Sequence, residues 1–164
     1  MKVFGIVGWK NSGKTYFAQQ IISILSSLNH RVASIKHAHH DFNIDYPGTD
    51  SYLFRKAGSQ QVIISSTKRW AKINELKNAP EKKLNELINE LENPEVVIVE
   101  GFKNENHPKI EIIKDSNDRS SFMFNNLNNI VALISDIHID SFTLDQFKKN
   151  QIKQIVEFIL SYEK

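Results

Sequence analysis

Residues 8–15 of the chain read GWKNSGKT, and this stretch decides the expected fold. It matches the pattern G-x-x-x-x-G-K-[ST], in which glycines let the backbone wrap around a phosphate with its N–H groups turned inward. The lysine of the pattern, Lys14, can reach the outer phosphates, and the hydroxyl of Thr15 can bind Mg²⁺. The alternative is a glycine turn with an exposed lysine, and the flanking sequence argues against it.

The motif stands between an apolar strand and an amphipathic helix, as a phosphate loop requires. Lys2–Val7 (KVFGIV) is typical of a buried strand, and Tyr16–Leu28 carries apolar residues at helical spacing. A helix in that place offers its positive N-terminal end to an anion. The residues that we expect to bind the nucleotide through this loop are Gly8, Trp9, Lys10, Asn11, Ser12, Gly13, Lys14, Thr15 and Tyr16.

Strand-like and helix-like segments alternate along the rest of the chain. The expected strands are Arg31–Lys36, Gln61–Ser65, Glu95–Val99, Lys109–Lys114 and Ile130–Ser135. Helices are expected over residues 50–57, from Pro80 through Leu91, and from a capping-box pattern at Thr143 and Gln146 through Tyr162. The alternation predicts an α/β fold, a P-loop NTPase-like sandwich with a largely parallel central sheet flanked by helices, in a single nucleotide-binding domain over residues 1–164.

Composition narrows the class of protein. The 164 residues are 40% hydrophobic and 24% charged, with a net charge of +2. The chain has no cysteine, which excludes disulfides, thiolate zinc sites and a cysteine nucleophile. The small net charge argues against a nucleic-acid partner, and no apolar run is long enough for a signal segment or a membrane span. We therefore expect a soluble, cytoplasmic protein.

A second phosphate-site element is expected at the end of the apolar run EVVIV. Glu100 follows this run and would lie at the carboxyl end of a central strand, where open α/β sheets bind their ligands. Its carboxylate would then lie beside Mg²⁺. An aspartate is the more usual residue at this place, and a surface carboxylate at a strand end is the alternative interpretation.

Four ordered stretches, GWKNSGKT, KHAHHDF, DYPGTDSYLFRKAGS and VEGFK, together resemble the MobB family of molybdopterin-guanine dinucleotide biosynthesis adaptor proteins. The resemblance covers the first two-thirds of the chain. It implies a homodimeric P-loop protein that binds GTP and Mg²⁺ and hydrolyses GTP weakly. It also implies a partner, a MobA-like nucleotidyltransferase that joins GMP to molybdenum-bound molybdopterin. Carried onto this sequence, it implies that Asp41 is a switch-type aspartate, that Lys14, Asp41 and Glu100 support catalysis, and that Thr15, Asp41 and Glu100 hold the metal.

The chain lacks the pattern N-K-x-D, the motif in which an aspartate usually recognises guanine. Asp136 is the best substitute, since it follows the strand-like run IVALIS and should lie on the same rim as the phosphate loop. A carboxylate there could accept two hydrogen bonds from the guanine N1–H and N2–H₂ groups. A helix or turn cap is an equally good interpretation of Asp136, so the preference for guanine rests on the resemblance.

The stretch IKHAHHDFNID, residues 35–45, gathers His37, His39, His40 and Asp41 after the second expected strand. A transition-metal site is one interpretation, although the spacing does not fix a tetrahedral geometry. We favour a switch loop in which Asp41 meets Mg²⁺, directly or through water, and the histidines meet phosphates or an anionic pterin. A solvated loop is the third interpretation. Arg55, on the short helix that follows, is a further candidate for binding the pterin phosphate.

Two rival functions remain open. A small-molecule kinase would use the same loop but needs a basic lid, and the few arginines of this chain are scattered. A non-hydrolysing adaptor would only grip the phosphates of a nucleotide or of molybdopterin. For the implied homodimer, the run KIEIIK (residues 109–114) is a plausible surface if it forms an edge strand with unpaired backbone groups.

Overall fold

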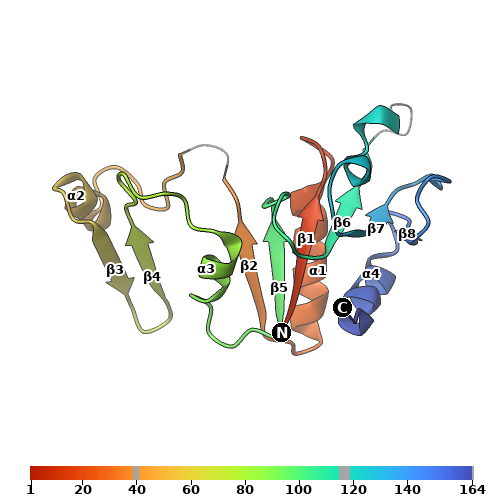
Figure 1. The fold of residues 1–164 in the computed structure, drawn as a ribbon. Coiled ribbons are helices and arrows are strands. Elements are labelled where there is room, and N and C mark those ends of the chain that lie inside the picture. Colours follow the sequence, from red (N-terminus) through yellow and green to blue (C-terminus); the bar gives the residue numbers. More distant parts are fainter. Residues whose placement is uncertain (39–40, 115–118, 164) are drawn as a thin grey trace. The chain divides into compact units, whose positions relative to one another are not determined.

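A computed structural model of the chain describes residues 1–38, 41–114 and 119–163. It divides into two compact units (Figure 1). Unit 1 comprises residues 1–37 and 84–164, and unit 2 comprises residues 38–83. Among the described residues, no helix is both long enough and apolar enough to cross a membrane.

Unit 1 is built on a parallel sheet. Its described strands are β1 (Lys2–Val7), β2 (Val32–Lys36), β5 (Val96–Glu100), β6 (Lys109–Ile112), β7 (Ile130–Ile134) and β8 (Asp145–Phe147). They run side by side in the order β2-β5-β1-β6-β7-β8, and every neighbouring pair is parallel (Figure 1). The carboxyl ends of these strands therefore meet at one rim, which is where the loop after β1 lies.

Both faces of this sheet are covered. Helices α1 (Lys14–Ser27) and α4 (Ile152–Ser161) pack on one face, where Phe4, Ile6 and Ile98 are fully buried. On the other face α3 (Leu84–Ile88) covers β2 and β5, and a segment with two 3₁₀ turns, η1 (Arg119–Ser121) and η2 (Met123–Asn125), covers β6 and β7. Burial on both faces explains why β5 is a continuous apolar run.

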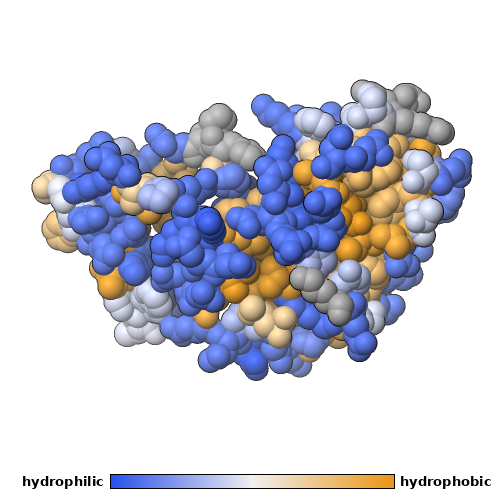
Figure 2. Space-filling model, viewed as in Figure 1, coloured by the Kyte–Doolittle hydropathy of each residue, from blue (hydrophilic) through white to orange (hydrophobic). Residues whose placement is uncertain are grey.

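Unit 2 consists of α2 (Asp50–Lys56) and an antiparallel hairpin of β3 (Gln61–Ser65) and β4 (Trp70–Asn74). Val62 of β3 is its one buried hydrophobic residue among those described. Large hydrophobic side chains remain exposed on this unit, and Figure 2 shows small orange areas among its mostly blue surface. They are Phe42, Ile44, Tyr46, Leu53, Phe54, Ile63, Ile64, Trp70 and Leu76.

The predicted strands are confirmed, but the predicted last helix is wrong at its beginning. Residues 145–147 form β8, and α4 begins at Ile152. Gln146 does not cap a helix: its side chain accepts from the Ile139 N–H (2.9 Å) and donates to the carbonyls of Ile139 and Phe142 (both 3.0 Å). A sequence pattern cannot tell such a tertiary use of glutamine from a local capping box.

Three smaller differences from the sequence-based elements concern α2, α3 and β4. Helix α2 begins at Asp50 as expected, with Thr49 as the residue before its first turn, and ends at Lys56, one residue earlier than expected. Helix α3 is limited to Leu84–Ile88, because the turn after Pro80 is not helical. Strand β4 was not expected, and it pairs with β3 outside the main sheet.

The proposed dimer surface at residues 109–114 is also wrong. Strand β6 lies inside the sheet, hydrogen-bonded to β1 on one side and to β7 on the other. Its backbone groups are therefore already paired and cannot receive a strand from a second copy.

Candidate functional site

The loop at residues 8–13 has the backbone conformation of a phosphate cradle. Gly8 (φ +150°), Asn11 (φ +61°) and Gly13 (φ +96°) all have positive φ angles. A Cβ atom on Gly8 would lie 2.6 Å from Ser12 Oγ and 2.8 Å from the carbonyl oxygen of Ile112. Only glycine therefore fits at position 8, because β6 passes directly behind the loop.

The polar groups of this loop fit a phosphate ligand. The Lys14 ammonium donates to the carbonyls of Gly8 (3.0 Å) and Trp9 (2.8 Å), which holds it against the loop. Ser12 is buried, and its Oγ has no hydrogen-bond partner among the described residues. Helix α1 begins at Lys14, so its free N–H groups lie at the same place. The side chains of Lys10, Asn11 and Tyr16 are exposed around the cradle.

Thr15 and Glu100 come together as the sequence predicts. Thr15 Oγ1 lies 3.3 Å from both carboxylate oxygens of Glu100. Glu100 ends β5, which pairs with β1 on one side and with β2 on the other. A hydroxyl and a carboxylate are the oxygen ligands that Mg²⁺ prefers, so this pair fits the metal. Lys36 Nζ, at the end of β2, lies 3.7 Å from Glu100 Oε2 and was not predicted as part of the site.

The backbone after Glu100 is shaped around His37. Gly101 has φ +93°, and a Cβ on it would lie 2.7 Å from the Cβ of His37. The next residue, Phe102 (φ +48°), stacks its ring on the imidazole with centroids 4.6 Å apart. The His37 N–H donates to the Glu100 carbonyl at 2.8 Å, which continues the β2–β5 ladder. His37 therefore has a packing role that the spacing of the histidines did not reveal.

The other members of the histidine stretch belong to unit 2 or lie outside the described residues. His39 and His40 lie outside the described residues. Asp41 belongs to unit 2, and its side chain is exposed. In the part of the chain that the structure describes, no group of three or more histidine, aspartate or glutamate side chains could hold a metal ion.

The segment after β6 is tied both to the phosphate loop and to the sheet. Trp9 Nε1 donates to the Ser121 carbonyl at 2.5 Å. Glu111, which is 1% exposed on β6, accepts from the N–H groups of Met123 (2.7 Å) and Phe124 (2.9 Å). Burial raises the pKa of Glu111, and these two hydrogen bonds offset part of that rise. The buried carboxylate thus fixes a segment that contacts the phosphate loop.

Lys109, the first residue of β6, holds the two chain segments that precede β6 and β7 through buried hydrogen bonds. Its buried ammonium donates to the carbonyls of Glu105 (2.6 Å), His107 (2.9 Å) and Asn128 (3.3 Å), and burial lowers its pKa.

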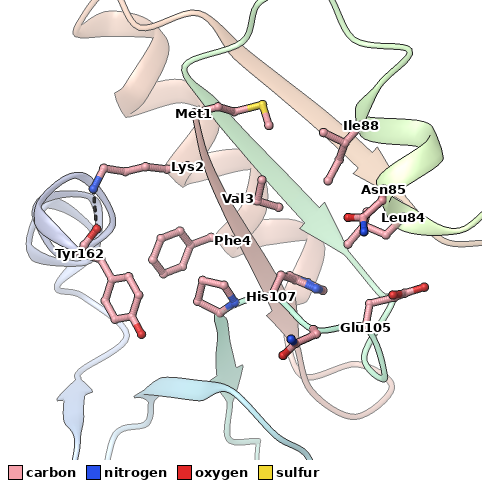
Figure 3. A pocket seen from close by; sticks show the side chains of 12 residues that line it. Met1, Lys2, Val3, Phe4, Leu84, Asn85, Ile88, Glu105, His107 and Tyr162 are labelled. Carbon is pink, nitrogen blue, oxygen red and sulfur yellow. Dashed lines mark hydrogen bonds between the residues drawn. The ribbon is translucent and has the colours of Figure 1, made fainter. Parts of the chain in front are cut away.

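A cavity of about 410 Å³ lies beside the loop at residues 105–108, between β1, α3 and the His107 ring (Figure 3). It is at the amino ends of the strands and so is separate from the rim that carries the phosphate loop.

Asp136 lies on the predicted rim, paired with a lysine. Its Oδ2 is 2.7 Å from Lys149 Nζ, and this contact lowers the pKa of Asp136. Lys149 follows β8, but the sequence predicts a helix over these residues. Because the sequence pattern does not indicate this strand, it does not predict the pairing of Lys149 with Asp136. Ser135 Oγ accepts from the Ile137 N–H at 3.3 Å and shapes the turn that carries Asp136.

Arg55 forms ion pairs with two carboxylates of unit 2. Its guanidinium donates to both carboxylate oxygens of Asp45, at 2.5 and 3.0 Å, and also contacts Glu75. These carboxylates raise the pKa of Arg55, and the same contact lowers the pKa of Asp45. The pairing connects α2 to the segment before it and to the residue after β4.

Comparison with known proteins gives one consistent result. The family model MobB, described as molybdopterin guanine dinucleotide synthesis protein B, matches residues 3–136. The chain is 30% identical to the molybdopterin-guanine dinucleotide biosynthesis adapter protein of Escherichia coli (strain K12), over 98% of this chain and 92% of that protein. It is 34% identical to the adapter protein of that name from Haemophilus influenzae, over 96% and 86%.

Solved structures show the same fold. A crystal structure of molybdopterin-guanine biosynthesis protein B superposes with a TM-score of 0.78 at 26% identity, covering 97% of this chain and 98% of that one. The MobB homologue from Bacillus stearothermophilus superposes with a TM-score of 0.75 at 20% identity, over 99% and 100%, and shows the fold alone. The expected P-loop NTPase-like architecture is confirmed.

Proposed function

Because the chain belongs to the molybdopterin guanine dinucleotide synthesis protein B (MobB) family, we propose that it binds GTP and Mg²⁺ at residues 8–15 and hydrolyses GTP slowly. Its place in molybdopterin guanine dinucleotide biosynthesis is that of an adapter. The partner that we propose is a MobA-like nucleotidyltransferase, which joins GMP to molybdopterin.

One observation carries the nucleotide proposal: the hydroxyl of Thr15 and the carboxylate of Glu100 meet at the phosphate cradle, 3.3 Å apart. These two groups would hold Mg²⁺, which supplies charge neutralisation at the phosphates when it is bound. The backbone N–H groups of the loop and the Lys14 ammonium would hold the phosphate oxygens. Positioning and charge stabilisation account for most of the catalysis of phosphoryl transfer, so a slow turnover is compatible with this small set of groups.

The test is calorimetric titration of GTP, and separately of ATP, into the Mg²⁺-loaded protein. We expect GTP to bind more tightly than ATP, and we expect Lys14→Ala to abolish both signals because the outer phosphates lose their cation. Phosphate release from GTP should be slow but above background. Tighter binding of ATP, with transfer of its phosphate to a small acceptor, would favour the kinase. Binding without release would favour the non-hydrolysing adaptor.

We also propose a homodimer, and the exposed hydrophobic residues of unit 2 support a surface for it. Ile63 is 66% and Trp70 is 61% exposed, and strand alternation places Ile63 on the hairpin face opposite the buried Val62. Apolar patches of this kind mark contact surfaces. Sedimentation velocity should show a dimer at micromolar concentration, and Ile63→Lys should shift it to monomer. Lys153→Glu, an exposed change on α4, is the control and should leave the dimer intact.

A further inference from the structure

Asp136 and Lys149 are placed as a pair on the rim that carries the phosphate loop. Each residue lies two positions beyond its strand, since β7 ends at Ile134 and β8 ends at Phe147. The two strands are parallel neighbours, and the Ser135 N–H donates to the Phe147 carbonyl at 2.8 Å. This backbone hydrogen bond fixes the two strand ends relative to each other, so the contact between the two side chains is built into the sheet.

The pair stays accessible from outside. Asp136 is 62% and Lys149 is 37% exposed at the side chain, so neither group is committed to the core. Ile137, the next residue, is 46% exposed and adds apolar surface beside the carboxylate. A polar edge next to an apolar surface is what a planar base requires of its site.

We infer that Lys149 is a specificity-determining residue that reads the guanine base of the nucleotide together with Asp136. The inference rests on the proposed binding of GTP. Lys149 Nζ lies 2.7 Å from Asp136 Oδ2, so the pair presents a donor and then two acceptors, Nζ, Oδ2 and Oδ1. Guanine presents the complementary order, with the O6 acceptor followed by the N1–H and N2–H₂ donors. The ammonium donates to O6, and the two carboxylate oxygens accept from N1–H and N2–H₂.

Adenine is rejected by the same array. Its N6–H₂ donor would face the ammonium donor, and its N1 acceptor would face a carboxylate oxygen. Both contacts are repulsive, so the pair discriminates by charge as well as by lost hydrogen bonds. The carboxylate alone would leave the O6 of guanine without a donor.

The distance along the rim from the phosphate loop to Asp136 suits the length of a nucleotide. Strand β7 is separated from β1 by β6, which amounts to two strand spacings or about 10 Å. Phosphates held at the end of β1 would therefore leave the ribose to bridge to a base at the end of β7. The base would lie on the rim, over the turn that Ser135 shapes.

The decisive variant is Lys149→Met, which keeps the aliphatic stem and removes the ammonium. Calorimetry with Mg²⁺ would compare four probes: GTP, ITP, ATP and tripolyphosphate. We expect Lys149→Met to weaken GTP and ITP about tenfold, since both carry O6, and to leave tripolyphosphate unchanged. ATP should bind equally well or more tightly. Lys149→Arg should restore most of the GTP preference, and Lys148→Met, a change at the adjacent exposed lysine, should have no effect.

The role of each partner can be separated. Asp136→Asn should weaken GTP more than ITP, because ITP lacks the 2-amino group that the carboxylate accepts from. If Lys149→Met keeps the wild-type ratio of GTP to ATP affinity while tripolyphosphate still binds, the inference is wrong and the proposed nucleotide site stands. If the wild-type protein binds neither tripolyphosphate nor GTP, the proposed function fails and the inference fails with it.

Discussion

Thr15 Oγ1 and the Glu100 carboxylate are 3.3 Å apart although 85 positions separate them in the chain. The contact is a consequence of strand order, because β5 pairs directly with β1 and places Glu100 opposite Ile6. The loop that leaves β1 then brings Thr15 back over the end of β5. The first turn of α1 and the end of β5 thus supply the two side chains of the proposed metal site.

Glu100→Gln should remove the dependence of GTP affinity on Mg²⁺. The amide keeps the size of the side chain but lacks the negative charge that a divalent cation requires. Titration of GTP in the presence of Mg²⁺ and in the presence of EDTA should give two clearly different affinities for the wild type and nearly equal ones for the variant. Glu92→Gln, at an exposed position, is the matched control. A Glu100→Gln protein that keeps the full Mg²⁺ effect would exclude Glu100 from the metal site.

Gly8→Ala should abolish nucleotide binding while the protein stays folded. The new methyl would lie 2.8 Å from the Ile112 carbonyl, which is backbone and cannot move aside, so the loop must deform. Gly58→Ala is the control for backbone strain, since Gly58 also has positive φ (+107°) but its Cβ would meet nothing within 4 Å. Calorimetry with GTP would measure nucleotide binding, and circular dichroism would show whether each variant is folded. Normal binding by Gly8→Ala would show that the cradle is not tight at this position.

The local parts of the fold and site could be predicted from the sequence. Strand β1, the glycine loop and α1 follow one another in the chain, so local pattern and spacing indicate all three, although α1 runs from Lys14 to Ser27 and not from Tyr16 to Leu28. Glu100 was also predictable, because a continuous apolar run indicates a strand buried on both faces, and ligands lie at the carboxyl ends of such strands.

What the sequence did not reveal depends on residues far apart in the chain. The order of the strands decided that β6 is an interior strand, and no local pattern carries that order. Gln146 and Thr143 have the spacing of a capping box, but Gln146 bonds to the turn at Ile139 and the residues around it form an edge strand. Lys149 was missed for the same reason, since its partner Asp136 belongs to the neighbouring strand end.

Glu111→Gln removes the buried negative charge and keeps one acceptor oxygen for the Met123 and Phe124 N–H groups, so it mimics the protonated carboxyl. The difference in stability from the wild type should depend on pH. Burial raises the pKa of Glu111 above its usual 4.5, so the folded state holds the proton more tightly than the unfolded state. The stability that Glu111 contributes is therefore fully present below pH 4.5 and is lost as the pH rises through the raised pKa.

Chemical denaturation of the wild type and of Glu111→Gln, from below pH 4.5 to neutral pH, would measure how the free energy of unfolding of each protein depends on pH. The free energy of unfolding of the wild type should be close to that of the variant below pH 4.5 and should fall below it as the pH rises. A wild type that becomes more stable than the variant with rising pH would mean that the two hydrogen bonds outweigh burial and that the pKa of Glu111 is lowered.

Arg55→Met should loosen unit 2 and leave unit 1 unchanged. The substitution leaves the Asp45 carboxylate, which is 4% exposed, without its guanidinium partner. Hydrogen exchange should then become faster over residues 41–83, and the peptides that contain β1 and β5 should keep their protection. Arg69→Met, at an exposed position of the same unit, is the control and should change neither.

The same ion pair predicts how unit 2 responds to acid. The hydrogen bonds from Arg55 hold the pKa of Asp45 below its usual 3.8, so the stability from this pair is present above pH 3.8 and is lost as the pH falls through the lowered value. Protection of residues 41–83 in the wild type should therefore persist to a lower pH than in Arg55→Met, where Asp45 has lost the cause of its shift. Equal acid sensitivity of the two proteins would show that the pair does not stabilise the unit, and that packing of α2 on β3 holds it together.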